Sequence, residues 1–275
     1  MKTTSYKDLF DLRGKVAVVT GGSGILGRHF CAGLAEAGAS VAVVDIQNES
    51  AAEVAAELVA TYSIDAAGIS CDVSNTDSVS KMVEQVVERF GEINILHNNA
   101  AAKSEDLAAF FAPFEEYSLS QWREIMSVNI DGMFLVAQAV GRQLLLQGKG
   151  GSIIQTSSIY GMMAPDNRIY EGSFYLGRKI NTPAVYAASK AAVVGLSKYL
   201  ATYWADKNIR VNTIAPGGTE SGQNDEFKAR YSARIPLNRM AYAHEIVGAL
   251  LYLASDASSY VTGQTILVDG GLSAW

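Results

Sequence analysis

Thr20-Gly21-Gly22-Ser23-Gly24-Ile25-Leu26-Gly27 is the stretch that decides the fold of this chain. It follows a short apolar run over 16–20 and precedes a helical pattern over 28–37, so the glycines lie at a strand-to-helix turn. Gly22, Gly24 and Gly27 match the dinucleotide fingerprint, in which missing side chains allow a tight turn and close backbone approach to a pyrophosphate. The N-terminus of the next helix would then face the pyrophosphate charge. An ordinary glycine turn is the alternative, because the pattern is weak when it stands alone.

An acidic residue follows at the spacing expected for a ribose contact. Asp45 ends a second apolar run, over 41–45, at roughly the 20-residue distance typical of this motif. Its carboxylate would accept hydrogen bonds from the adenosine ribose and repel a 2'-phosphate. The turn from Gly21 to Gly27 contains no Arg or Lys that could pair with such a phosphate. The sequence therefore favours NAD over NADP, with a solvated strand-end carboxylate as the alternative reading of Asp45.

Short apolar runs, rich in Val and Ile, alternate with longer segments of helical period. They cover residues 16–20, 41–45, 66–70, 93–97, 152–156, 210–214 and 265–268. Near-continuous apolarity is typical of strands covered by helices on both faces, and right-handed crossovers make such a sheet doubly wound. We therefore expect an α/β fold: a Rossmann-type, doubly wound parallel sheet of about seven strands with helices on both faces. No linker or composition shift interrupts the pattern, so residues 1–275 are predicted to form a single domain.

The composition argues against several other classes of protein. The chain has 22 basic and 28 acidic side chains, a net charge of -6 and no basic run, which disfavours nucleic acid as a partner. Cys31 and Cys71 are too few for a disulfide framework, and the three histidines are scattered, so no metal site is predicted. Neither a signal peptide over 1–15 nor a long apolar segment is found in the sequence. We expect a cytoplasmic protein without a membrane partner.

A tyrosine and a lysine begin a long apolar helical pattern after Pro183. Tyr186 and Lys190 are four residues apart, a spacing that places both side chains on one helix face. A free tyrosine is a poor base at neutral pH, but an adjacent ammonium stabilises the phenolate and lowers the tyrosine pKa. Tyr186 is therefore a candidate acid and base for an alcohol. The same spacing occurs at Tyr175 and Lys179, but that copy contains Gly177 and is followed by Pro183 rather than by a helix, so we favour Tyr186.

The chain resembles the short-chain dehydrogenase/reductase family over essentially its whole length, because its motifs occur in the same order as in that family. The matching pieces are the turn at 20–27, Asp72-Val73, Asn98-Asn99-Ala100, Asn129, Ser157-Ser158, Tyr186 with Lys190, and Pro216-Gly217. The regions 234–243 and 268–275 resemble the sugar and sugar-acid members, such as gluconate or mannonate oxidoreductases. The resemblance implies an enzyme that transfers a hydride between a nicotinamide cofactor and an alcohol or ketone, and a homotetrameric assembly.

The family resemblance also implies roles for individual residues. Tyr186 would act as acid and base, Lys190 would lower its pKa and hold the nicotinamide ribose, Ser158 would orient the substrate oxygen, and Asn129 would position a water for proton relay. Asn129 lies inside a helix expected over 121–146, where Asn has a low propensity, although a surface-facing Asn is the alternative. The implied nucleotide-binding set is Gly21, Ser23, Gly24, Ile25, Leu26, Gly27, Asp45, Ile46, Asp72, Val73, Asn99, Ala100, Ala101, Tyr186, Lys190, Pro216, Gly217 and Thr219.

One segment departs from the family pattern. Ser158 and Tyr186 are 28 positions apart, about twice the usual interval, and residues 164–183 fit neither a helical nor a strand period. Because this insertion separates two residues that would hold the reacting oxygen, we expect it to form a wall or lid of the substrate site. Its charged and aromatic side chains, Arg168, Arg178, Lys179, Tyr170 and Tyr175, suit a polyhydroxylated or anionic substrate, with solvated loop charges as the alternative. Residues 219–237 would form a second wall.

These observations predict an NAD-dependent oxidoreductase that interconverts a secondary alcohol and a ketone, on a sugar, a polyol or a sugar acid. An NADPH-dependent reductase of a ketone or 3-oxoacyl substrate is the alternative within enzymes. A protein that only binds NAD is the alternative outside them, and the retention of both Tyr186 and Lys190 argues against it.

Overall fold

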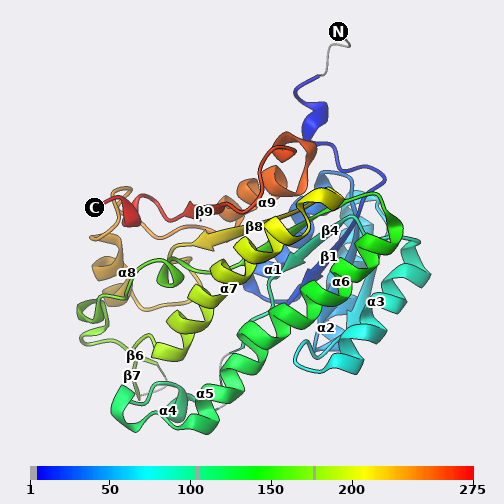
Figure 1. Ribbon diagram of the computed structural model, residues 1–275. Helices are drawn as coiled ribbons and strands as arrows, with labels where there is room; N and C mark the ends of the chain where they lie inside the picture. The colour runs from blue at the N-terminus through cyan, green and yellow to red at the C-terminus, as the bar shows by residue number, and fades with distance from the viewer. Residues whose placement is uncertain (1–4, 103, 105, 176–177) are drawn as a thin grey trace.

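Seven parallel strands form one continuous sheet in the order β3-β2-β1-β4-β5-β8-β9 (Figure 1). The computed structural model describes residues 5–102, 104, 106–175 and 178–275. The strands of the sheet are β1 (Val16–Thr20), β2 (Ser40–Asp45), β3 (Ala66–Ser70), β4 (Ile95–Asn98), β5 (Gly151–Thr156), β8 (Ile209–Pro216) and β9 (Thr265–Val268). The predicted α/β fold, a doubly wound parallel sheet of seven strands, is confirmed, and each predicted strand lies within about two residues of an observed one.

Helices cover both faces of this sheet. Their bounds are α1 (Ile25–Glu36), α2 (Asn48–Tyr62), α3 (Thr76–Phe90), α4 (Leu107–Phe110), α5 (Leu119–Met126), α6 (Met133–Gln147), α7 (Ala184–Tyr203), α8 (Asp225–Ser232) and α9 (Val247–Ala254). The helices α3, α6 and α7 pack on one face, where α6 and α7 lie in front of the sheet in Figure 1, and α1, α2 and α9 pack on the other. Two apolar layers therefore enclose the strands.

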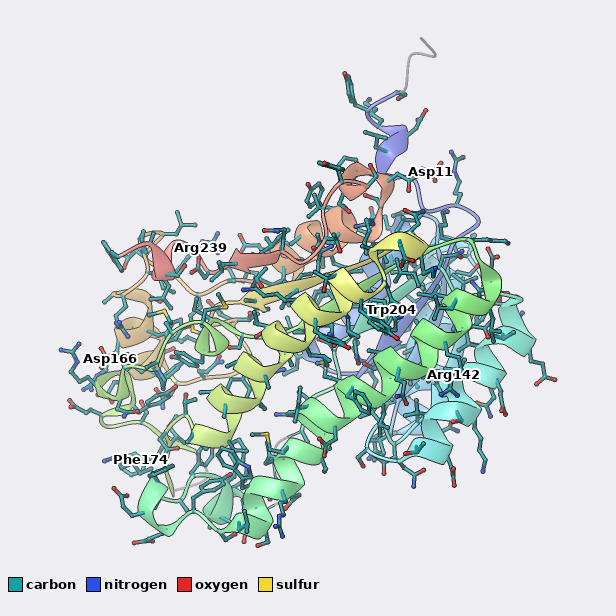
Figure 2. All side chains as sticks on the ribbon, in the orientation of Figure 1. Asp11, Arg142, Asp166, Phe174, Trp204 and Arg239 are labelled. Atoms are coloured by element: carbon teal, nitrogen blue, oxygen red, sulfur yellow. The ribbon has the colours of Figure 1, made fainter. Side chains whose placement is uncertain are left out.

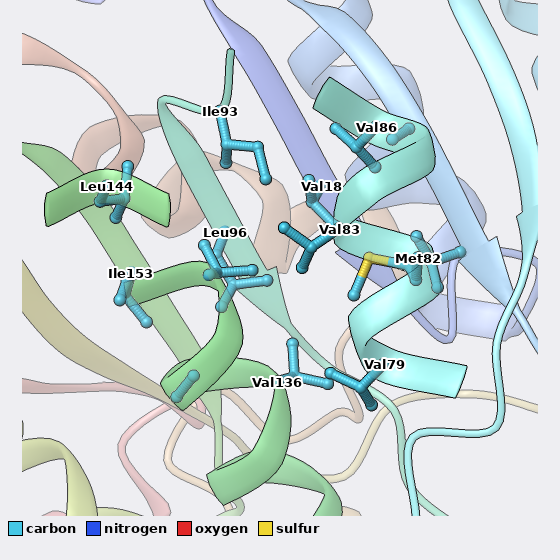
Figure 3. Close-up of a cluster of buried hydrophobic side chains, with 14 of the residues drawn as sticks. Val18, Val79, Met82, Val83, Val86, Ile93, Leu96, Val136, Leu144 and Ile153 are labelled. Atoms are coloured by element: carbon cyan, nitrogen blue, oxygen red, sulfur yellow. The ribbon is translucent and has the colours of Figure 1, made fainter. Parts of the chain in front are cut away.

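The packing between α3, α6 and the sheet is shown in Figure 3. Val79, Met82 and Val86 of α3 meet Val136 of α6 over Leu96 of β4, and all are almost fully buried. Burial of each such side chain stabilises the fold by about 1.5–3 kcal/mol. On the neighbouring helix pair, Trp204 lies between α6 and α7 (Figure 2), so close to Gly141 that a Cβ there would fall 2.3 Å from the ring. A rigid core thus supports the carboxyl ends of the strands.

The strand order reverses between β1 and β4. From β1 the chain winds outward through β2 and β3, and then returns to place β4 on the other side of β1. The connections that follow β1 and β4 therefore leave in opposite directions and open a crevice at the carboxyl ends of these strands. Ligands bind at this position in open α/β sheets.

The helix expected over 121–146 is interrupted. The α5 and α6 helices are joined by a π-helical segment, Ser127–Gly132, which contains Asn129. Single-turn π segments insert an extra residue into a helix and frequently occur at functional sites. The helix expected over 121–146 is thus observed as α5, the π-helical turn and α6, and the wider turn, which the sequence did not predict, accommodates a poor helix former at Asn129.

The insertion at 164–183 is more regular than its sequence indicates. Residues Asn167–Tyr170 form a 3-10 turn, and β6 (Phe174–Tyr175) pairs antiparallel with β7 (Arg178–Lys179). The expectation that this segment fits neither helix nor strand is thus wrong, because residues of two short strands cannot establish a periodic pattern. Gly177, within the rejected tyrosine-lysine copy, lies outside the described residues.

None of the helices in the described part of the chain is both long enough and apolar enough to cross a membrane.

Candidate active site

One cleft of about 820 Å³ lies over the carboxyl ends of the central strands. Every member of the nucleotide-binding set, from Gly21 to Thr219, lines this cleft, and so does Ser158. Asn129 does not line it and lies buried behind it. The fold therefore brings residues that are far apart in sequence to one space, at the switch in strand order where α/β sheets bind ligands.

The glycine turn after β1 leaves room where side chains would block it. Gly21 has a φ of +63°, a left-handed conformation that favours glycine. A Cβ on Gly27 would fall 2.0 Å from the carbonyl oxygen of Gly21, whereas one on Gly24 would lie 3.3 Å from the same atom. Gly27 is thus required for α1 to begin close beneath the turn. The turn and the first residues of α1 form a cradle of the kind that holds a pyrophosphate.

The ends of β1, β2 and β4 are tied together by hydrogen bonds around this turn. The Asp45 carboxylate accepts from the Ser23 amide at 3.1 Å, which links the end of β2 to the glycine turn. The Thr20 hydroxyl accepts from the backbone amides of Asn99 and Ala100 at 2.9 and 3.1 Å. These bonds fix the walls of the cleft before any ligand binds, so the site is preorganised.

Tyr186 and Lys190 lie in the first two turns of α7, with Lys190 Nζ 5.8 Å from the centre of the Tyr186 ring. Lys190 Nζ donates to the Thr156 carbonyl at 3.1 Å, and burial lowers the pKa of Lys190 to about 8. Burial raises the pKa of the Tyr186 hydroxyl, and its hydrogen bond with Ser158 offsets part of the rise. The net shift of the Tyr186 pKa is upward and Lys190 is not among its causes, so the lowering expected from Lys190 stays a prediction.

The two adjacent serines after β5 have different partners. The Ser157 hydroxyl donates to the Lys190 carbonyl at 2.6 Å, which ties β5 to the first turns of α7. The Ser158 hydroxyl is hydrogen-bonded to Tyr186 in the cleft and also accepts from the Tyr160 amide at 3.2 Å. The Ser157 hydroxyl is therefore bonded to the backbone of α7, and both serines line the cleft together with Tyr186.

Asn129 connects the π-helical segment to the catalytic helix. Its Oδ1 accepts from the Ala102 amide at 2.9 Å and its Nδ2 donates to the Ser189 hydroxyl at 3.3 Å. Ser189 in turn donates to the Tyr186 carbonyl at 2.9 Å. Asn129 thus fixes the position of the loop after β4 relative to the start of α7. Its role in positioning a water stays a prediction.

The remaining wall of the cleft is formed by side chains from four separate segments. Tyr160 follows β5, Tyr170 comes from the insertion, Tyr231 comes from α8, and Met240 follows α8. Tyr170 and Tyr231 each stack on Phe227, with ring centres 5.5 and 5.6 Å apart. Tyr170 and Tyr231 lie in the walls predicted from the sequence, whereas Tyr160 and Met240 were not predicted. Position alone, two residues beyond Ser158, could have indicated Tyr160.

Two charged side chains of the insertion, Arg168 and Lys179, are exposed and do not line the cleft. The Arg168 side chain is 82% exposed and pairs with Asp166 at 2.7 Å, and Arg234 pairs with the same carboxylate at 3.3 Å. Asp166 lies at the same end of the molecule as α8 (Figure 2). Lys179 is exposed on β7, across from Phe174 of β6, so the second tyrosine-lysine copy lies on a hairpin and not on one helix face. Arg168 and Lys179 therefore do not line the cleft.

Comparison with known proteins gives a consistent result. A family model described as "Enoyl-(Acyl carrier protein) reductase" matches residues 21–273. A D-threitol dehydrogenase of Mycolicibacterium smegmatis is 37% identical over 267 residues, which cover 95% of this chain and 94% of that protein. A 2-dehydro-3-deoxy-D-gluconate 5-dehydrogenase of Dickeya dadantii is 35% identical over 268 residues, with 95% and 96% of the two chains covered.

A solved structure extends this similarity to the fold. The gluconate 5-dehydrogenase of Burkholderia cenocepacia, in complex with NADP and tartrate, superposes with a TM-score of 0.86 at 34% identity, covering 98% of each chain. The chain belongs to the short-chain dehydrogenase/reductase family of oxidoreductases.

Proposed function

We propose that this protein is an NAD-dependent oxidoreductase that interconverts a secondary alcohol and a ketone on a sugar, a polyol or a sugar acid. The observation that supports this most is the shared cleft, where Tyr186, Ser158 and Lys190 face the same space as the glycine turn and Asp45. The threitol, deoxygluconate and gluconate dehydrogenases named above support the substrate class. Proton transfer and nucleotide binding thus meet at one place.

The residues present fit a nicotinamide dinucleotide. The glycine turn that lines the cleft, the positive end of α1 and the carboxylate of Asp45 match the pyrophosphate and the adenosine ribose. Pro216 and Thr219 would border the nicotinamide, and Lys190 would hold its ribose. When bound, this group accepts or supplies the hydride at the reacting carbon of the substrate.

Side chains of the protein orient the substrate oxygen and transfer its proton. In oxidation, the Tyr186 phenolate takes the hydroxyl proton of the alcohol, and in reduction the neutral Tyr186 returns it. Ser158, already hydrogen-bonded to Tyr186, orients the substrate oxygen. Below about pH 8 the Lys190 ammonium keeps its proton and favours the phenolate over the neutral hydroxyl. Asn129 would hold a water that carries the proton onward.

Asp45 is the feature that favours NAD over NADP in this proposal. Its carboxylate ends β2 at the cleft, where a 2'-phosphate on the adenosine ribose would meet a like charge. The gluconate 5-dehydrogenase of similar structure carries NADP, so the relatives leave this preference open. Reduction of an acyl-carrier ketone with NADPH is the runner-up, and Asp45 argues against it.

Three further properties belong to this proposal. Residues 1–275 are taken as one NAD-binding domain in which the insertion 164–183 forms a wall of the substrate site, supported by Tyr170 and Thr182 in the cleft lining. A homotetramer and a cytoplasmic location are proposed from the family resemblance.

A screen of sugars, polyols and sugar acids tests the proposed function. Each compound is mixed with enzyme and either NAD or NADP, and the absorbance of the reduced cofactor is followed. We expect turnover of at least one compound class and a higher kcat/KM for NAD than for NADP. The absence of turnover with every alcohol and both cofactors would overturn the proposal.

A further inference from the structure

Three tyrosine hydroxyls converge in the part of the cleft next to Ser158 and Tyr186. Tyr170 and Tyr231 are 7% and 4% exposed, and Tyr160 packs against the cluster that contains them and lines the same cleft. The Tyr170 hydroxyl is bonded to Thr182, and the Tyr231 hydroxyl accepts from the Gly218 amide at 2.8 Å. We call these three residues the tyrosine trio. The Tyr170 and Tyr231 rings are fixed by stacking on Phe227, so their hydroxyls are held in place in the cleft wall.

The same region lacks positive charge. Among the cleft-lining residues that the structure describes, Lys190 is the one basic side chain, and it is engaged with the Thr156 carbonyl. Arg168 and Arg234 share Asp166, and Arg230 pairs with Glu226 at 2.9 Å and with Glu171 at 3.4 Å. The nearby guanidinium groups are thus neutralised by carboxylates outside the cleft.

The tyrosine trio remains uncharged at neutral pH. Burial raises the pKa of all three hydroxyls, that of Tyr231 to about 12. A neutral phenol can both donate and accept a hydrogen bond, which matches the hydroxyl group of a polyol. A carboxylate entering this region would lose its hydration without gaining a cationic partner, a transfer that is strongly unfavourable.

We propose that the tyrosine trio determines specificity and selects a neutral polyhydroxylated substrate, an alditol or its ketose, over a sugar acid. This inference rests on the proposed function and narrows its substrate class. The hydroxyls of Tyr160, Tyr170 and Tyr231 bind substrate hydroxyls remote from the reacting carbon. The alditol would lose its hydroxyl proton to Tyr186 and a hydride from the same carbon to bound NAD⁺, two electrons in all, and become a ketose. A substrate without remote hydroxyls forms none of these additional hydrogen bonds and is turned over less efficiently.

The test compares kcat/KM for three sets of compounds: alditols, aldonates of the same chain length, and simple secondary alcohols without further hydroxyls. Wild-type enzyme is expected to turn over the best alditol at least tenfold better than the best aldonate. Tyr160→Phe and Tyr170→Phe are expected to lower kcat/KM for the alditol by about tenfold or more, and for the simple alcohol by less than about twofold. Tyr242→Phe, an exposed tyrosine outside the cleft, is the matched control and should change neither value.

The outcomes separate this inference from the proposed function. An aldonate turned over as well as the best alditol, or variants that lose the same factor on alditols and simple alcohols, would overturn the inference and leave the proposed function standing. No turnover of any alcohol with either cofactor would overturn both. Tyr231→Phe also removes the acceptor of the Gly218 amide, so Tyr160→Phe and Tyr170→Phe carry the test if that variant does not fold.

Discussion

The nucleotide half and the substrate half of the cleft are built from different parts of the polypeptide. The nucleotide half consists of backbone turns and short side chains at strand ends, with Gly27 and Asp45 as its main determinants. The substrate half consists of large side chains, chiefly the tyrosine trio and Phe227, from segments that meet only in the folded chain. A ligand with a constant structure can be bound by a contiguous motif, whereas substrate choice depends on residues that tertiary structure brings together. Tyr186 lies where the two halves join.

Removal of the Tyr186 hydroxyl, where the two halves of the cleft join, should have the largest effect on activity. We expect Tyr186→Phe to lower kcat by about a thousandfold, because no other described group takes the proton from the substrate oxygen. Tyr175→Phe, the matched change in the second tyrosine-lysine copy, should leave kcat nearly unchanged. Steady-state rates of alcohol oxidation with NAD check both variants. Loss of activity in Tyr175→Phe with retention in Tyr186→Phe would reverse the assignment.

The nucleotide half can be tested at the glycine turn with a matched pair. Gly27→Ala should weaken NADH binding by tenfold or more and lower the free energy of unfolding by about 1–3 kcal/mol, because its Cβ would collide with the Gly21 carbonyl at 2.0 Å. Gly24→Ala places its Cβ 3.3 Å from the same oxygen and should have a much smaller effect on both quantities. Calorimetric titration and urea unfolding measure them. Equal effects of the two substitutions would contradict the assigned geometry of the turn.

The choice between NAD and NADP depends on Asp45, the second determinant of the nucleotide half. Asp45→Ser should weaken NADH binding by about tenfold and reduce the preference for NADH over NADPH, since it removes a charged acceptor from the ribose and a repulsive group from the 2'-phosphate. Fluorescence titration of the wild type and the variant with both cofactors checks this. Tighter binding of NADPH than NADH by the wild-type protein would show that Asp45 does not set the preference.

The smallest expected effect is on the free energy of unfolding, through His97, which is buried below the cleft. Burial lowers the pKa of His97 to about 3, and its Nε2 is 2.9 Å from the Thr156 hydroxyl. The unfolded chain protonates this histidine near its ordinary value of 6.5 while the folded chain does not, so stability should decline as pH falls below 6.5. The contribution is at most about 1.4 kcal/mol per pH unit. Urea unfolding of His97→Leu should show a shallower decline, with exposed His29→Gln as control; an unchanged slope would contradict the assignment.

The fold and the nucleotide half could be read from the sequence because their determinants are local. Apolar runs identified each strand of the main sheet, and Gly21 to Gly27 identified the turn after β1. The hairpin of β6 and β7 and the π-helical segment around Asn129 could not be predicted, since one is too short for periodicity and the other depends on an extra residue within a helix. Tyr160 was not predicted, although its position two residues beyond Ser158 could have indicated it; its packing against Tyr170 and Tyr231 is visible only in the folded protein.

The pairing of Tyr186 with Lys190 is tested most directly by the pH dependence of alcohol oxidation in wild-type enzyme and in Lys190→Met. Oxidation requires the Tyr186 phenolate, so kcat/KM should rise with pH until the tyrosine is deprotonated. Since the ammonium favours the phenolate while Lys190 keeps its proton, below about pH 8, its removal should move this rise to higher pH by about one unit or more. A rise at the same or at lower pH in Lys190→Met would contradict the account.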